Sequence, residues 1–144
     1  MADTRLIHDV SQAEGVRLTA YKDTLGNWTA GVGHLLPTGK DYTGFTITQE
    51  QCDEWLNQDL THWGDFAKTL PEWPSLDTAC RQNAVIELCF NMGRRWLGFV
   101  NARGAMQRQD WQTAHDQMLS SGWAAQVHGR ATRLASYILT GQYP

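Results

Sequence analysis

The apolar positions at the start of the chain recur with the spacing of a helix. Between residues 5 and 14 they fall on one face of a short helical segment. Asp3 or Thr4 stands where an N-cap is needed, because its side-chain oxygen can accept a hydrogen bond from an unpaired backbone N–H. The residues on the apolar face are Leu6, Ile7, Val10 and Ala13.

From Arg17 the alternation of apolar and polar residues changes to a period of two, which is typical of a strand. A turn at residues 25–27 then sends the chain back along residues 28–36. Gly31 and Gly33 lie in the returning stretch, where a glycine indicates that another part of the chain approaches the backbone closely. We therefore predict a hairpin within a small sheet that ends near residues 36–45.

Helical spacing returns at Thr48, where TQEQ fits a capping box between Thr48 and Gln51. Pro71 and Pro74 end this helix, because proline lacks the N–H that a helix requires. Residues 76–93 are apolar around most of a helical circumference and predict a central buried helix closed by a glycine. Shorter helices are expected at about 99–108, 110–120, 123–126 and 129–140. A small sheet near the start of a helical protein predicts an α+β fold.

Length and charge indicate how many domains to expect and which classes of binding partner to exclude. The chain has 144 residues, 42% hydrophobic and 19% charged, which fits one globular domain. The net charge of -3 argues against non-specific binding to nucleic acid or to an anionic membrane. Residues 94–133 nevertheless hold six arginines against two acids, so a basic face on an acidic protein is expected there.

The three cysteines, Cys52, Cys80 and Cys89, predict buried free thiols and a reducing compartment. Cys80 and Cys89 lie roughly 13 Å apart along a helix, which is beyond disulfide reach. The N-terminus shows neither a basic start nor an apolar run, so no signal peptide is expected. No apolar run is long enough to span a membrane.

The hairpin carries an unusual set of polar groups. Glu14 stands where the first helix gives way to strand, Asp23 precedes the turn, and Thr29 lies on the returning strand. The turn brings Thr29 back beside Asp23 and toward the helix end that carries Glu14. Two opposed carboxyls are what glycoside hydrolysis requires, one protonated to serve the leaving oxygen and one ionised. A nearby hydroxyl can hold the water.

A structural interpretation stands beside this one. Glu14 could be a helix-end acid, Asp23 a turn former and Thr29 an ordinary strand residue. The triple alone therefore permits a glycosidase but does not require one.

The hairpin motif resembles the N-terminal signature of the lysozymes of T-even bacteriophages and their relatives, the phage endolysins of glycoside hydrolase family 24. That family's pattern is Glu-Gly, then Tyr-x-Asp, then Thr-x-Gly-x-Gly-His. This chain shows Glu14-Gly15, Tyr21-Lys22-Asp23 and, from Thr29 to His34, TAGVGH. The resemblance continues in order through residues 55–60, 81–93 and 98–101, and through the spacing Trp123, Arg130, Arg133.

The resemblance implies a muramidase that cuts the β-1,4 bond between N-acetylmuramic acid and N-acetylglucosamine in peptidoglycan. Glu14 would be the general acid, with Asp23 acting as base on a water held by Thr29, and inversion is favoured over Asp23 as nucleophile. Residues that match sugar-contacting cleft positions are Leu35, Phe90 and Gln117, and Arg130 matches an arginine near the catalytic glutamate.

The implied fold is a single two-lobed domain over residues 1–144. Residues 14–60 would form the sheet-bearing lobe, and residues 1–13 with 61–144 the helical lobe, with a long helix from Thr48 to about Leu70 between them. The implied protein is a monomer that needs no cofactor or metal and binds peptidoglycan glycan strands, not nucleic acid or membrane. It would accumulate in the host cytoplasm and reach the wall after the membrane is permeabilised.

Several positions depart from the family. The segment between His34 and Thr48 is short, and Gly122 replaces a usual arginine. Gln117 stands for an asparagine and Ala102 for a serine. The protein is also acidic, whereas those relatives are basic. These differences bear on substrate subsites and wall affinity and leave the catalytic triple in place.

Other interpretations stand beside this one. His34 could be catalytic or a metal ligand, but it is expected to be structural and to pair with Asp59. The five histidines lack the HExxH spacing of a zinc amidase. A lytic transglycosylase would cut the same bond with one acid and no water, and a virion-borne lysozyme or a non-catalytic wall-binding protein would share the fold. Trp123 is expected to belong to the core.

Overall fold

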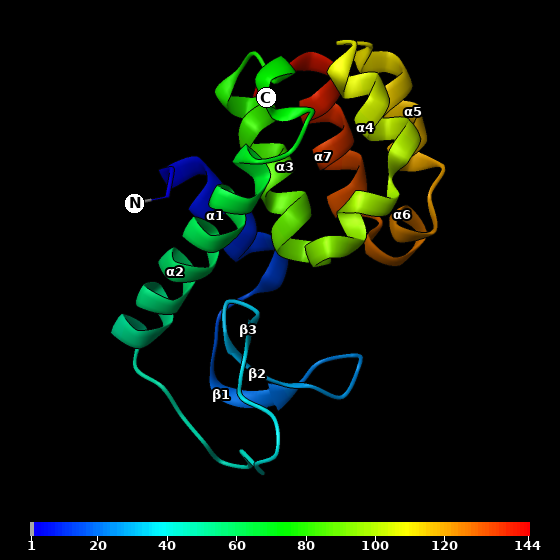
Figure 1. Ribbon diagram of the computed structural model, residues 1–144. Coiled ribbons are helices and arrows are strands. Elements are labelled where there is room, and N and C mark those ends of the chain that lie inside the picture. The colour runs from blue at the N-terminus through cyan, green and yellow to red at the C-terminus, as the bar shows by residue number, and fades with distance from the viewer. Residues whose placement is uncertain (1) are drawn as a thin grey trace. The chain divides into compact units, whose positions relative to one another are not determined.

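A computed structural model describes residues 2–144 of the chain (Figure 1). Within these residues there are seven α-helices and one three-stranded antiparallel sheet, which confirms the predicted α+β class. The internal contacts divide the chain into two compact units, residues 1–62 and 63–144. The predicted placement of residues 1–13 in the helical lobe concerns the packing of the two units and stays a prediction.

The first unit opens with helix α1, Thr4–Glu14. Asp3 is its N-cap, and its carboxylate accepts hydrogen bonds from the backbone N–H groups of Arg5 and Leu6 at 2.9 and 3.2 Å. Leu6 and Val10 are buried, as the apolar face predicts. The helix ends at Glu14 because Gly15 follows with φ 75°, outside the helical region.

The sheet has the order β1-β2-β3, formed by β1 (Arg17–Lys22), β2 (Trp28–Gly31) and β3 (His34–Leu35). The predicted hairpin is therefore confirmed. The segment after β3 returns to it: the N–H of Ala20 donates to the carbonyl of Phe45 and that of Ile47 to the carbonyl of Leu18, each at 2.8 Å. The chain from 36 to 47 thus closes over β1 instead of leaving the sheet directly.

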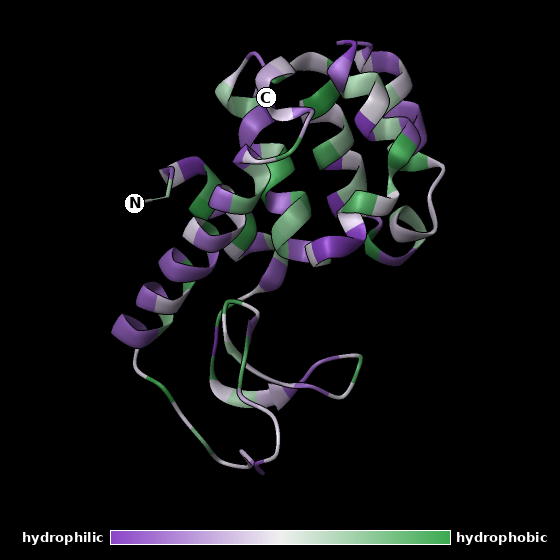
Figure 2. Ribbon diagram, in the orientation of Figure 1, coloured by the Kyte–Doolittle hydropathy of each residue, from purple (hydrophilic) through white to green (hydrophobic). Residues whose placement is uncertain are grey.

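Helix α2, Gln49–Lys68, confirms the predicted long helix and contributes residues to both units. Its cap is Thr48, whose hydroxyl accepts from the N–H of Gln51 at 3.1 Å. The first turns of α2 are mainly hydrophilic (Figure 2), and a buried stripe of Cys52, Leu56 and Leu60 faces away from water.

His34 joins the sheet to α2, as predicted. Its Nδ1 lies 2.8 Å from the Asp59 carboxylate, and its ring stacks on Trp55 with 4.4 Å between centroids. The structural role of His34 is thereby confirmed.

The second unit is built around α3, Ala79–Met92, where residues 84–89 are all buried. It packs side by side with α7, Gly129–Thr140, and the Arg81 guanidinium donates to the carbonyls of Ile138 and Leu139. The remaining elements of this unit are η1 (Trp73–Ser75), η2 (Gly93–Gly98), α4 (Val100–Gln107), α5 (Trp111–Leu119) and α6 (Gly122–Val127).

The predicted core residues lie where expected. Trp123 is 6% exposed and donates its Nε1–H to the Asn91 side chain at 2.6 Å. The cysteines at 52, 80 and 89 are free and buried. Burial raises the pKa of the Cys89 thiol to about 12, and the nearby Glu72 charge adds to this effect. Within residues 2–144 no helix combines the length and apolar character needed to cross a bilayer.

Candidate active site

Glu14, the last residue of α1, lies against the backbone that leads into β3. A Cβ atom added at Gly33 would lie 3.0 Å from Glu14 Oε2 and 3.3 Å from its Cδ. The close backbone approach predicted at Gly33 is therefore confirmed, and its partner is the candidate acid. A Cβ atom added at Gly31 would likewise lie 3.3 Å from the Cys52 sulfur.

Asp23 organises the turn between β1 and β2. Its Oδ1 accepts the backbone N–H of Leu25 at 2.9 Å and that of Asn27 at 2.8 Å. The structural role of Asp23 as a turn former is thus confirmed. Both bonds end on Oδ1, so neither occupies Oδ2, and one carboxylate can serve the turn and a ligand with different oxygens.

Thr29 lies on β2 directly opposite Tyr21 of β1. Its hydroxyl donates to the carbonyl of Asn27 at 3.0 Å, and the residue is 3% exposed. Since the hydroxyl proton is committed to Asn27, the oxygen presents lone pairs and acts toward a further group as an acceptor.

Tyr21 is a neighbour that Glu14 and Asp23 share. Burial raises the pKa of the Tyr21 phenol, the Glu14 charge raises it further, and Asp23 adds a smaller increase. The Arg17 guanidinium lies 4.0 Å from the centre of the ring and acts in the opposite direction. Sequence reasoning gave Tyr21 no role beyond its place in the Tyr-x-Asp motif, two residues before Asp23.

The candidate sugar-binding residues are divided between the units. Leu35 on β3 is 59% exposed, which is high for a large apolar side chain. Phe90 on α3 is half-buried. The structure places Leu35 with the catalytic candidates in the first unit, and Phe90, Gln117 and Arg130 in the second.

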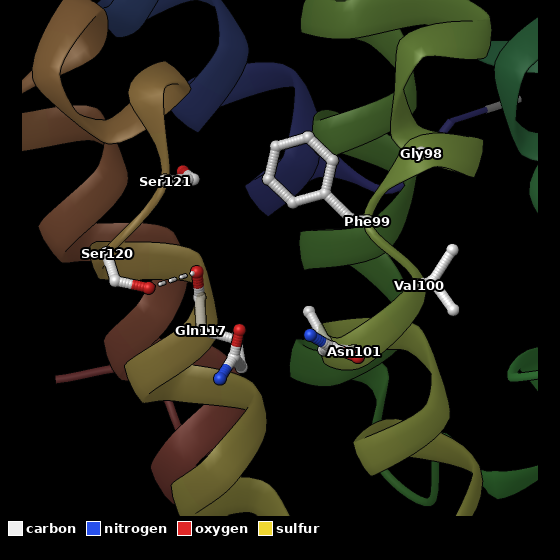
Figure 3. Close-up of a pocket in the computed structure, with 8 residues that line it drawn as sticks. Gly98, Phe99, Val100, Asn101, Gln117, Ser120 and Ser121 are labelled. Carbon is white, nitrogen blue, oxygen red and sulfur yellow. Dashed lines mark hydrogen bonds between the residues drawn. The ribbon is translucent and has the colours of Figure 1, made fainter.

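Gln117 lines a pocket of about 370 Å³ between α4 and α5 (Figure 3). Ser120 donates its hydroxyl to the backbone carbonyl of Gln117 at 3.2 Å. Asn101 and Ser121 also line it and had no predicted role, although Asn101 belongs to the GFVN motif at 98–101. The full lining is Gly98, Phe99, Val100, Asn101, Ala102, Gln117, Ser120 and Ser121.

Arg130 belongs to a buried ion cluster in the second unit. Its Nε donates to Glu87 Oε2 at 2.9 Å, and Arg133 donates to both oxygens of the same carboxylate at 3.0 and 2.6 Å. Glu87 is 1% exposed, so the two guanidiniums supply the charge that its burial requires. The role of Arg130 toward Glu14 stays a prediction.

Comparison with known proteins shows the family of the chain. Residues 11–135, most of the chain, match the Phage lysozyme family. The chain belongs to the phage lysozyme family. The predicted enzyme class, a glycoside hydrolase of the lysozyme type, is confirmed by this match. The matched range contains all of the residues predicted for the site.

Three relatives illustrate the range of proteins to which this chain is similar. The pre-baseplate central spike protein Gp5 of Enterobacteria phage T4 is 31% identical over 89% of this chain, which spans 26% of that protein. An endolysin of Acyrthosiphon pisum secondary endosymbiont phage 1 is 29% identical over 90% of this chain and 84% of its own length. The endolysin of Salmonella phage P22 is 32% identical over 76% and 75%.

A substitution at Gly33 tests whether this glycine of the lysozyme positions the Glu14 carboxylate. We expect Gly33→Ala to lower kcat roughly 10- to 100-fold, because small misplacements of a catalytic group are costly. The added Cβ would meet Glu14 Oε2 at 3.0 Å, and φ at this position is +66°. Steady-state turnover of purified peptidoglycan, corrected for the folded fraction, measures the effect.

Gly44→Ala is the matched control for backbone strain. Gly44 has φ +77° with nothing within 4 Å of an added Cβ. The positive φ alone should cost each variant roughly 1–2 kcal/mol of stability. Equal kcat values for the two would contradict a role of Gly33 in positioning Glu14.

Tyr21 reports on the charge of the lysozyme's candidate acid. In Glu14→Gln the Tyr21 pKa should fall, because phenolate formation no longer works against a neighbouring carboxylate. The part of the increase that burial causes should persist. Titration of ¹³Cζ-labelled tyrosine by NMR resolves Tyr21 from the other three tyrosines. An unchanged pKa would place Glu14 farther from Tyr21 than the structure does.

Proposed function

We propose that this lysozyme is a muramidase of the endolysin type that hydrolyses the β-1,4 bond between N-acetylmuramic acid and N-acetylglucosamine in peptidoglycan. The observation that carries the proposal is that one hairpin brings the three groups together: the Glu14 carboxylate lies against Gly33, Thr29 lies on β2 opposite Tyr21, and Asp23 holds the turn that joins β1 to β2. The family and the endolysin relatives support peptidoglycan as the substrate.

Glu14 donates a proton to the leaving glycosidic oxygen. On the other side of the sugar, a water donates one hydrogen bond to the Thr29 hydroxyl, whose own proton is committed to Asn27. Its second hydrogen points to Asp23 Oδ2, since Oδ1 is engaged by the turn. A lone pair of this water then attacks the anomeric carbon as Asp23 takes the proton, which inverts the configuration.

Each unit offers side chains suited to a sugar. Leu35 offers an exposed apolar side chain to a sugar face, and Phe90 offers part of a ring. Gln117 presents its amide in the pocket of α4 and α5. One chain carries the whole triple, so the site needs no residue from a second copy; the proposed enzyme is a monomer that acts on the bacterial cell wall.

Product analysis on purified peptidoglycan tests this function. Hydrolysis yields muramic acid with a free reducing end, which mass spectrometry separates from the anhydro end of a transglycosylase. NMR of the first-formed anomer then decides the mechanism. An α product supports inversion, a β product makes Asp23 the nucleophile, and an anhydro end refutes hydrolysis.

The two functions of Asp23 can be separated by substitution. Asp23→Asn keeps an acceptor oxygen for the N–H groups of Leu25 and Asn27 but removes the charge. We expect kcat to fall at least about 100-fold, as for loss of a general base, while the thermal midpoint changes little. Asp23→Ala should lose both activity and about 1 kcal/mol of stability. Full activity of Asp23→Asn would reduce Asp23 to a turn former.

A further inference from the structure

A second pocket lies entirely within the first unit, at the edge of the sheet. It has a volume of about 560 Å³. Lys22 and Trp28, which face each other at the turn end of β1 and β2, form one side. The loop after β3 forms the other. The lining residues are Lys22, Trp28, Gly39, Lys40, Asp41 and Thr43.

This pocket lies on the face of the hairpin opposite the candidate catalytic groups. The cross-strand pairs Tyr21–Thr29 and Lys22–Trp28 are consecutive. Successive side chains of a strand point to opposite faces, so Lys22 and Trp28 point away from the side that holds Tyr21 and Thr29. A ligand here does not compete with a sugar at the catalytic triple.

The pocket concentrates positive charge on an acidic protein. The chain has three lysines, and two of them, Lys22 and Lys40, line this pocket. The Lys22 ammonium lies 5.4 Å from the centre of the Trp28 ring, which keeps the cation next to an apolar surface.

Asp41 adds one anionic group of fixed orientation. Its Oδ1 accepts the hydroxyl of Thr43 at 2.6 Å and the N–H of Thr43 at 2.9 Å. These bonds, and to a smaller extent the Lys22 charge, hold the pKa of the Asp41 carboxyl below its usual value. Asp41 is therefore ionised at neutral pH, and its Oδ2 is outside both bonds.

Two ammonium groups, one carboxylate oxygen and an indole match a zwitterionic peptide that has free carboxylates, an amino group and alkyl segments. We propose that this pocket binds the peptide stem of a peptidoglycan strand through its free carboxylates. The inference rests on the proposed function, because peptidoglycan is the polymer that brings such peptides to the enzyme. It assigns the back of the hairpin to holding the wall while the opposite face cleaves it.

Titration of the ¹⁵N-labelled full chain with a free stem peptide tests the proposal, with no bond cleavage required. We expect shifts at residues 39–43 and at the Trp28 indole N–H. Lys40→Glu should raise Kd about fivefold or more, as for reversal of one exposed ion pair, and salt should weaken binding. Lys68→Glu is the matched control, since Lys68 is exposed and lies outside the pocket, and it should leave Kd unchanged.

Three comparison ligands test whether the pocket recognises carboxylates, sugars or a lipid surface. The same peptide with amidated carboxylates should bind weakly, and a peptide-free chitin tetrasaccharide should not shift residues 39–43. Equal binding of the amidated peptide would overturn carboxylate recognition, and vesicles of anionic phospholipid that displace the peptide would point to a lipid surface instead. If the enzyme hydrolyses the wall but does not bind the peptide, this inference is wrong and the proposed function stands. If it binds the peptide but does not hydrolyse the wall, the proposed function is wrong.

Discussion

Glu14→Gln is expected to lower kcat for peptidoglycan hydrolysis by about 10²- to 10⁴-fold, the range that general acid–base catalysis contributes. The amide has the size and shape of the carboxyl but cannot give a proton to the leaving oxygen. The glycan's departing hydroxyl would then leave as an alkoxide, which is the poorer leaving group. Turnover of purified wall material measured by release of reducing ends gives the value.

The fold should survive this substitution. Glu14 is the last residue of α1, where the N–H of Gly15 donates to the carbonyl of Ser11 at 2.9 Å, and the substitution leaves this backbone cap in place. Thermal unfolding and sugar binding should therefore be close to those of the parent chain.

Glu54→Gln is the matched control, an exposed glutamate on α2 of the same unit. It should retain full activity. Wall clearing by Glu14→Gln at the rate of Glu54→Gln would remove the enzymatic interpretation of the triple and favour a non-catalytic wall-binding role.

The local parts of this fold could be predicted because each is specified by a few neighbouring residues. Asp3 and Thr48 precede their helices and make the predicted caps. Gly93 and Gly141 follow α3 and α7 with positive φ, which other residues seldom adopt. Period-two alternation likewise revealed β1, although Leu18 within it and Val16 just before it are 36% and 49% exposed, so the alternation marks extended backbone more than burial here.

The long-range polar contacts could not be predicted by the same means. Glu87 meets Arg130 and Arg133 across 43 and 46 residues. Nothing in the spacing of these residues links them, because their meeting depends on how α3 packs against α7. That the Glu87 charge is buried can be recognised only from the three-dimensional packing of the helices around it.

The candidate site could be predicted in part. The turn places Asp23 and Thr29 by local geometry, and this could be reasoned from the sequence. That Gly33 accommodates the Glu14 carboxylate depends on the return of the chain after β2, so the sequence indicated only that some group would approach this glycine. The roles of the sugar-contacting residues came from the family resemblance and not from spacing.

Arg103→Met is expected to reduce the free energy of unfolding by about 3–5 kcal/mol, the cost of removing one partner from a buried ion pair. Glu72 is 0% exposed. Its carboxylate accepts Arg103 Nε at 2.8 Å and Nη2 at 3.1 Å, and Trp96 Nε1–H at 2.8 Å. Without Arg103 only the indole remains among these donors, and a neutral N–H does not balance a buried negative charge.

The double variant Glu72→Gln/Arg103→Met separates charge from packing. A neutral amide needs no counter-ion and still accepts the Trp96 N–H, so the double variant should be more stable than Arg103→Met alone. Arg108→Met, an exposed arginine at the end of α4, should change stability by no more than about 0.5 kcal/mol. Urea unfolding followed by far-UV circular dichroism measures all three variants. If the double variant were as unstable as the single one, the loss would come from the packing of the Arg103 side chain, and the stranded charge on Glu72 would not be its cause.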